Sequence, residues 1–243
     1  MDFKTIIEPF KIKSVESLPI TTPVQRKEFL EREHWNVFGL KSQEVTIDLL
    51  TDSGTGSMSS EQWAAIMRGD EAYAGSHSWQ RFHEVVSDLT GYKHIIPTHQ
   101  GRASEKILAT ITLKEGDIIP SNSHFDTTRA NFESAQANPI DLLCEEGLDL
   151  LSPSAFKGNI DLEKLEALLS GKDSDKVPFV LMTITNNTGG GQPVSMDNLK
   201  KVKALCEKYN KMFLLDACRF AENAWFVSQR EEDYKDVEIR DIT

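Results

Sequence analysis

Strand-like segments separated by helical patterns fill the chain from residue 93 onward, and this alternation is the feature that most limits the fold. Alternation of this kind predicts a mostly parallel sheet with helices on both faces, which is an α/β fold. The strand-like segments are 93–97, 117–120, 140–144, 179–185 and 212–217, and the main helical patterns are 102–113, 161–170 and 195–209.

The N-terminal part follows a different pattern. Prolines interrupt residues 1–45, which predicts an irregular arm that leads into a short helix over 24–39. We expect an N-terminal arm and small-domain segment over residues 1–50 and a large ligand-binding domain over 51–243.

Two further helices are predicted between these parts. After a strand-like run at 45–57, Ser59 and Gln62 have the spacing of a capping box at a helix start. Residues 78–91 carry apolar side chains at helical spacing, and Gly91 stands where a C-terminal cap would be.

Composition excludes several classes of function. The 243 residues are 39% hydrophobic and 27% charged, as in soluble globular proteins, and the net charge of −11 argues against nucleic-acid binding. The apolar runs are too short to span a membrane, and charges interrupt the N-terminus, unlike a signal peptide. Three cysteines without CxxC spacing predict reduced thiols and a cytoplasmic location.

A carboxylate ends the last strand-like segment. In "FLLDACRFAENAWF", an apolar run stops at Asp216, and Arg219 follows three residues later. A buried unpaired charge is costly, so each group needs a partner, either in the protein or in a bound molecule. In an open parallel sheet, ligands bind beyond the carboxyl ends of the strands.

Three other strand ends carry polar or aromatic groups. "PTHQGRASE" leads into a helix through Gly101 and Arg102, which suits a phosphate. "NSHFDTT" places Phe125 at a turn, and "TNNTGGGQPVS" places Asn187 before three glycines. Alternatively, Arg102 and Arg219 form ion pairs at helix starts and Phe125 is a packing residue. Together with Asp216, these groups suit a phosphorylated, aromatic, protonatable ring, of which pyridoxal phosphate is the common example.

Other ligand motifs are missing from the sequence. It contains no G-x-x-x-x-G-K-[ST] motif, and "SGTGSM" lacks the third glycine of a dinucleotide fingerprint. His99 and His124 have no partners at metal-ligand spacing.

Six segments resemble one enzyme family, in order and over nearly the whole chain. The segments "IDLLTDSGTG", "GDEAYAGS", "IPTHQGR", "FDTT", "GGQPVS" and "DACRFAENAWF" resemble the β-eliminating lyases, the family of tryptophanase and tyrosine phenol-lyase. The resemblance implies the fold type I of pyridoxal-phosphate enzymes and a carbon–carbon lyase activity. An aldolase of the same fold type would share the aspartate but not "FAENA" with "GDEAYAGS".

The resemblance implies a role for each matching residue at the cofactor. Asp216 would bind the pyridinium nitrogen, Arg219 and Asn187 would bind the phenolic oxygen, and Phe125 would stack on the ring. The phosphate would be held by Gln100, Gly101 and Arg102.

It also implies roles outside the cofactor site. Tyr73 would donate a proton toward the leaving group in a neighbouring subunit's site, which requires a homo-oligomer, a tetramer by resemblance. Thr51 falls at a substrate-carboxylate position. Gly54 and Glu71 match a monovalent-cation site that potassium usually fills.

The substrate follows from smaller differences between family members. Asp126 and "RFAENA" resemble tryptophanase, whereas "SSEQWAAIM" and "GDEAYAGS" resemble the phenol-lyase. An acid near the leaving group assists proton delivery to an indole carbon. We therefore expect conversion of L-tryptophan to indole, pyruvate and ammonia, with L-tyrosine to phenol as the alternative. Ala103 stands where the family usually has glycine.

Family members are nearly twice as long as this chain. By resemblance, the Schiff-base lysine, a phosphate-binding serine and a substrate-binding arginine would lie beyond Thr243. We expect the chain to be a portion of a lyase, completed by further sequence or by a complementary chain. The alternative is a non-catalytic fragment or binding module, but the presence of all the matched cofactor residues favours the lyase.

Overall fold

The computed structural model describes residues 17–48, 50 and 58–243 and divides the chain into two compact units, residues 1–78 and 79–243. The boundary between residues 50 and 51 stays a prediction, because residues 49 and 51–57 lie outside the described part.

The first unit contains short helices. Its described elements are α1 (Pro23–Arg32), η1 (Val37–Gly39), η2 (Ser42–Glu44) and α2 (Ser60–Arg68). The helix predicted over 24–39 is divided in two, because His34 and Trp35 adopt left-handed backbone angles that end α1. The predicted capping box of Ser59 and Gln62 is confirmed at the start of α2. Residues 45–48, part of the run predicted as strand-like, form no strand.

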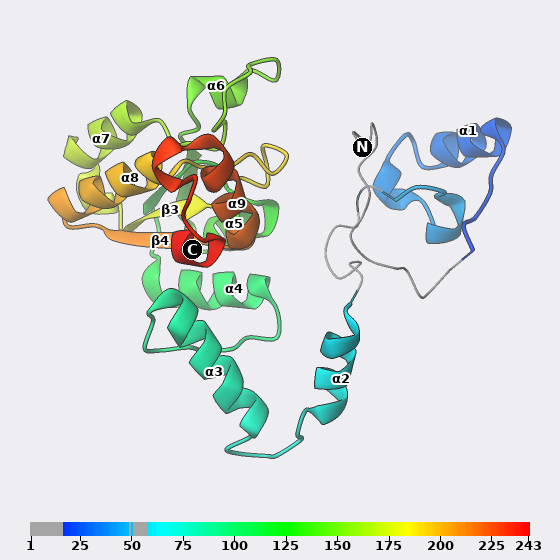
Figure 1. The fold of residues 1–243 in the computed structure, drawn as a ribbon. Coiled ribbons are helices and arrows are strands. Elements are labelled where there is room, and N and C mark those ends of the chain that lie inside the picture. Colours follow the sequence, from blue (N-terminus) through cyan, green and yellow to red (C-terminus); the bar gives the residue numbers. More distant parts are fainter. Residues whose placement is uncertain (1–16, 49, 51–57) are drawn as a thin grey trace. The chain divides into compact units, whose positions relative to one another are not determined.

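The described residues of the second unit form a four-stranded parallel sheet of order β2-β1-β3-β4. Its strands are β1 (Ile118–Ser121), β2 (Asn138–Asp141), β3 (Phe179–Thr183) and β4 (Met212–Asp216). Figure 1 labels the neighbouring strands β3 and β4 of this sheet. The predicted parallel sheet is therefore confirmed.

Helices alternate with these strands along the chain. They are α3 (His77–Thr90), which begins just before the second unit, α4 (Gly101–Thr112), α5 (Asp126–Ser134), α6 (Glu145–Leu148), α7 (Leu162–Ser170), η3 (Ser174–Lys176), α8 (Met196–Lys208), α9 (Phe220–Arg230), η4 (Glu232–Tyr234) and α10 (Ile239–Ile242). Gly91, with φ of 72°, follows the end of α3 as predicted.

Strand β3 divides the core into two layers because successive side chains point to opposite faces. Phe179 and Leu181 belong to a buried cluster with Phe132 of α5 and Ala109 of α4. Val180 and Met182 belong to the opposite cluster, which contains residues of α7 and α8. Helices therefore cover both faces, which confirms the predicted α/β fold.

One predicted strand is absent from the described structure. Residues 93–97 are irregular, and Ile96 is 83% exposed. A short apolar run that has no neighbouring strand cannot satisfy its backbone groups in a sheet, and Pro97 removes one donor.

Candidate active site

Three loops leave the sheet at the carboxyl ends of its strands. They follow β1, β3 and β4 and comprise residues 122–125, 184–187 and 217–219. Because the strands are parallel, these loops and the end of β4, Asp216, lie at one edge of the sheet, which we term the carboxyl edge.

Hydrogen bonds join the loops of the carboxyl edge to one another. The backbone N–H of Arg219 donates to the carbonyl of Ile184 over 3.0 Å. The hydroxyl of Thr188 donates to the carbonyl of His124 over 2.8 Å. The second bond brings the loop that carries Asn187 next to the residue before Phe125. The structure therefore places four predicted residues, Phe125, Asn187, Asp216 and Arg219, at one edge.

The start of α4 carries the predicted phosphate-binding residues. Gln100 is the N-cap residue with extended backbone, and Gly101 begins the helix. The exposed Arg102 lines a shallow cleft of about 270 Å³ with residues of α5. Glu105, one turn further on, accepts hydrogen bonds from Thr128 and Asn131 of α5. These bonds hold α4 against the helix that begins just after Phe125.

The half-buried carboxyl group of Asp216 lies in an environment that disfavours its charge. Burial raises the pKa of Asp216, and the charge of Glu105 raises the pKa further. The N–H of Cys218 donates to Oδ1 over 3.3 Å, and this bond opposes the shift only in part. A cationic ligand nitrogen at this carboxylate would relieve the penalty, so the site fits a protonated pyridine ring.

Several buried polar atoms of the carboxyl edge have no hydrogen-bond partner. Within the described part of the chain, these atoms are Nδ2 of Asn186, Oγ1 of Thr185 and Nε2 of His124. Buried polar groups are usually satisfied, so this edge has spare hydrogen-bonding capacity.

The other predicted residues fall outside the described part, belong to the first unit or begin α5. Thr51 and Gly54 fall outside the described residues. Glu71 and Tyr73 belong to the first unit, and both are exposed. Asp126 lies at the exposed start of α5, where its Oδ1 accepts a 2.6 Å hydrogen bond from the N–H of Thr127. In the described part of the chain, no group of three potential metal ligands occurs.

Sequence reasoning missed a buried histidine at the edge. Nδ1 of His124 lies 2.7 Å from Oδ1 of Asp141, whose Oδ2 accepts a 2.6 Å bond from Arg129. Burial alone would raise the pKa of Asp141, but these two partners outweigh it and lower the pKa. No signal in the sequence pointed to this pair, because the predicted segment 140–144 put Asp141 near the start of a strand, whereas the structure has Asp141 at the end of β2.

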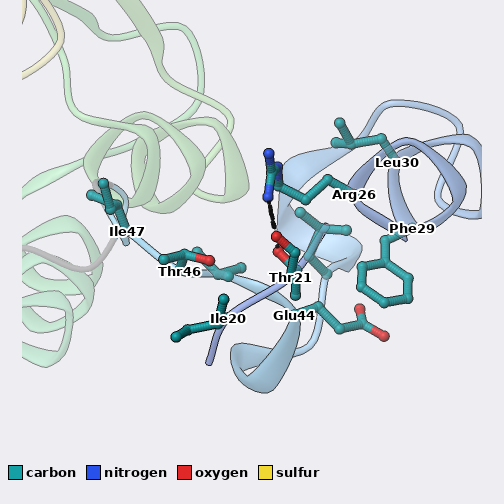
Figure 2. Close-up of a pocket in the computed structure, with 10 residues that line it drawn as sticks. Ile20, Thr21, Arg26, Phe29, Leu30, Glu44, Thr46 and Ile47 are labelled. Carbon is teal, nitrogen blue, oxygen red and sulfur yellow. Dashed lines mark hydrogen bonds between the residues drawn. The ribbon is translucent and has the colours of Figure 1, made fainter. Parts of the chain in front are cut away.

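The first unit contains a separate cavity of about 570 Å³ (Figure 2). Apolar side chains such as Phe29, Leu30 and Ile47 line it, and the guanidinium of Arg26 binds the carbonyl of Thr21. None of the predicted site residues lines this cavity. No described helix is long and apolar enough to cross a membrane.

The second unit is an α/β domain whose carboxyl edge carries an acid with a raised pKa and buried polar atoms without partners in the described residues. The chain belongs to the β-eliminating lyase family, whose model, described as "Beta-eliminating lyase", matches residues 48–242. The family resemblance seen in the sequence is thereby confirmed.

Curated relatives include enzymes of both predicted specificities. The chain is 53% identical to a tryptophanase of Salinibacter ruber and 55% identical to one of Rhodobacter capsulatus, in each case over 98% of its length. It is 47% identical to a tyrosine phenol-lyase of Pasteurella multocida over 97% of its length. These alignments cover 50%, 52% and 51% of the relatives, so the chain spans about half of their length.

Proposed function

We propose that this chain forms most of a pyridoxal-phosphate site in a lyase that eliminates the aromatic side chain of an L-amino acid. The observation that carries the proposal is the half-buried Asp216, whose pKa is raised by burial and by Glu105 at the carboxyl edge. A protonated ring nitrogen is the partner that this carboxylate lacks. Membership of the family supports the same assignment.

The ring would be held by residues already gathered at the edge. Asp216 would keep the ring nitrogen protonated, Arg219 and Asn187 would bind the phenolic oxygen, and Phe125 would fix the plane of the ring. Gln100, Gly101 and Arg102 would bind the phosphate at the start of α4, where backbone dipoles favour an anion. When bound, pyridoxal phosphate supplies an electron sink for a carbanion. We assign the covalent link to the cofactor to none of the lysines in these 243 residues.

We further propose tryptophan as the preferred substrate and tyrosine as the alternative. The identities of 53% and 55% to tryptophanases, against 47% to a tyrosine phenol-lyase, support this order. Asp126 begins α5 directly after Phe125, where a carboxyl group can deliver a proton to the leaving group. Tyr73 would supply a second proton donor from a neighbouring subunit.

The remaining assignments complete the proposal. Thr51 would bind the substrate carboxylate, and Gly54 and Glu71 would bind potassium or another monovalent cation. The whole enzyme would be a cytoplasmic homotetramer. A chain that stays strictly monomeric in sedimentation experiments would contradict a role for Tyr73 in a neighbouring site.

Ligand binding tests the cofactor site without requiring a lysine. Pyridoxamine phosphate lacks the aldehyde, so its affinity for the purified chain, measured by calorimetry, reports the non-covalent site alone. We expect Asp216→Ala to weaken binding by about tenfold or more, since a charge-assisted hydrogen bond contributes roughly 1.5–3 kcal/mol. The control is Asp197→Asn, at an exposed carboxylate paired with Lys201. Equal weakening by both variants, or no binding to the unmodified chain, would contradict the site.

Substrate preference has its own test. The complete enzyme, in which further sequence or a complementary chain supplies the Schiff-base lysine, is given pyridoxal phosphate. The release of indole from L-tryptophan is then compared with the release of phenol from L-tyrosine. Faster phenol release would replace the tryptophan assignment by the tyrosine one.

A further inference from the structure

His124 directly precedes Phe125, and three of its groups are bound to other segments of the carboxyl edge. Its backbone N–H donates to Oδ1 of Asp141 over 2.9 Å, and its ring nitrogen Nδ1 lies 2.7 Å from the same oxygen. Its carbonyl accepts a 2.8 Å bond from the hydroxyl of Thr188. Asp141 ends β2, and Thr188 follows Asn187 in the loop after β3. One residue after β1 therefore ties together the ends of three strands.

Arg129 closes a circuit of hydrogen bonds that contains Phe125. Its Nη2 donates to Oδ2 of Asp141 over 2.6 Å, and its backbone N–H donates to the carbonyl of Phe125 over 2.9 Å. Asp141 in turn binds the N–H of His124, the residue before Phe125. The backbone is therefore held on both sides of the Phe125 side chain, which restricts the direction in which this ring points.

The carboxylate of Asp141 selects one form of the His124 ring. Burial opposes the ionisation of Asp141, but the hydrogen bonds from His124 and the charge of Arg129 outweigh it and lower the pKa. Near neutral pH the carboxylate can therefore only accept, so Nδ1 carries a proton. The imidazole is fully buried and lies edge-to-face with Phe132, and its Nε2 has no partner in the described residues.

Packing alone does not explain a histidine at this position. A buried ring nitrogen without a partner destabilises a fold, so an apolar side chain of similar size would fill the same space at lower cost. An apolar side chain cannot supply the donor to Asp141. The bond from Nδ1 is therefore the feature that distinguishes His124 from a packing residue.

We propose that His124 is a positioning residue for an aromatic ring bound at the carboxyl edge. Through Asp141 it sets the orientation of Phe125. Through the hydroxyl of Thr188 it holds the loop of Asn187 beside that residue. The inference rests on the proposed function, in which Phe125 stacks on the ring and Asn187 binds its phenolic oxygen. It adds a residue outside the family resemblance described above.

Two substitutions test the donor at Nδ1. Asparagine carries its side-chain N–H group as far from the backbone as Nδ1, whereas glutamine carries it one bond further out. His124→Asn should therefore keep the bond to Asp141, and His124→Gln should lose it. By calorimetry, pyridoxamine phosphate should bind His124→Asn within about twofold of the unmodified chain and His124→Gln about fivefold to tenfold more weakly.

The order of these two variants distinguishes positioning from packing. Asparagine leaves the larger space in the core, so a packing role predicts that His124→Asn is the more damaging change. The control is His94→Gln, at an exposed histidine of the same unit, which should bind as the unmodified chain does. Weakening by His124→Asn that equals or exceeds that by His124→Gln would overturn the proposal.

A double-mutant cycle tests whether His124 acts through Phe125. Phe125→Leu removes the flat face that would stack on the ring. In that background His124→Gln should weaken pyridoxamine phosphate no further, because the face that His124 orients is absent. Weakening by the same factor in both backgrounds would show that His124 acts independently of Phe125, and it would overturn the proposal.

A second pair of variants lies on the neighbouring loop and leaves the core intact, since Thr188 is exposed. Thr188→Ser keeps the hydroxyl that binds the carbonyl of His124, and Thr188→Val keeps the shape without the hydroxyl. Thr188→Val should weaken pyridoxamine phosphate about threefold or more, and Thr188→Ser should change the affinity by less than about twofold. Equal affinities of the two variants would overturn the role of this bond, even where His124→Gln does not fold.

The outcomes separate this inference from the proposed function. If pyridoxamine phosphate does not bind the unmodified chain, the proposed cofactor site fails and this inference fails with it. If it binds the unmodified chain and the variants of His124 equally well, the cofactor site stands and only the role of His124 fails.

Discussion

The side-chain amide of Asn122 binds both backbone groups of Thr183. Nδ2 donates to the carbonyl over 3.0 Å, and Oδ1 accepts from the N–H over 2.9 Å. Nδ2 also donates to the carbonyl of Gly158 over 2.8 Å. Strand β1 ends at Ser121, so this fully buried side chain continues the pairing with β3 where the backbone of β1 turns away. These bonds join the starts of the two loops that carry Phe125 and Asn187.

Replacement of Asn122 should therefore be costly. Asn122→Ala removes four buried hydrogen bonds, the three above and one that Oδ1 accepts from the hydroxyl of Ser121. We expect a loss of about 3 kcal/mol in the free energy of unfolding. Urea denaturation measures the loss. Asn138→Ala, at an exposed position at the start of β2, should change stability by less than about 0.5 kcal/mol. Similar midpoints for the two variants would show that the amide of Asn122 contributes little.

Asp216→Asn should stabilise the ligand-free chain near neutral pH. The pKa of Asp216 is raised in the folded state by burial and by Glu105, so its ionisation costs stability as the pH rises through that pKa. Below the ordinary pKa of about 3.9 the carboxyl is protonated in both states and the cost vanishes. The gain from the variant should therefore be larger near pH 7 than near pH 4, as measured by urea denaturation. With pyridoxamine phosphate present, the unmodified chain should be more stable than the variant, because the ligand binds the unmodified chain more tightly. A gain that does not depend on pH would exclude charge as its cause.

Asp141→Asn should make the stability of the folded chain depend less on pH in the acidic range. Hydrogen bonds from His124 and the charge of Arg129 outweigh burial and lower the pKa of Asp141, so its contribution is present above about pH 4 and is lost as the pH falls through the folded-state value. We expect a lower melting temperature for the variant near pH 6 and a smaller difference from the unmodified chain near pH 3. Asp175→Asn, at an exposed acid, serves as the control. Parallel melting curves at the two pH values would argue against this linkage.

Phe132 joins the core to the carboxyl edge. Its ring lies 5.8 Å from that of Phe179 and 5.8 Å from that of His124, in edge-to-face arrangements. Phe132→Ala should lower the free energy of unfolding by roughly 3–5 kcal/mol, as for other large-to-small changes in a core. Phe38→Ala, at an 81% exposed position, should cost less than about 1 kcal/mol by the same denaturation measurement. A small loss of stability in Phe132→Ala would mean that the surrounding side chains move to fill the space that the ring leaves, which would contradict the prediction.

Local patterns in the sequence determined most of the secondary structure. Five consecutive buried residues form β3, and Ser59, Asp161 and Ser195 cap the helices that follow them, because these features act within one turn or one strand. The acid at the end of β4 also indicated a ligand site before any contact was known. The prediction of a strand at 93–97 was wrong, because an apolar run becomes a strand only when a neighbouring strand completes its hydrogen bonds.

Only the tertiary structure decided which distant groups meet. Glu105 acts on Asp216, His124 pairs with Asp141, and Asn122 binds Thr183 across different strands and helices. Sheet order and register place these residues together, and neither depends on spacing along the chain. The charge of a carboxylate depends on its burial and its neighbours. For this reason the sequence identified Asp216 as an acid in need of a partner, whereas its raised pKa required the folded arrangement around it.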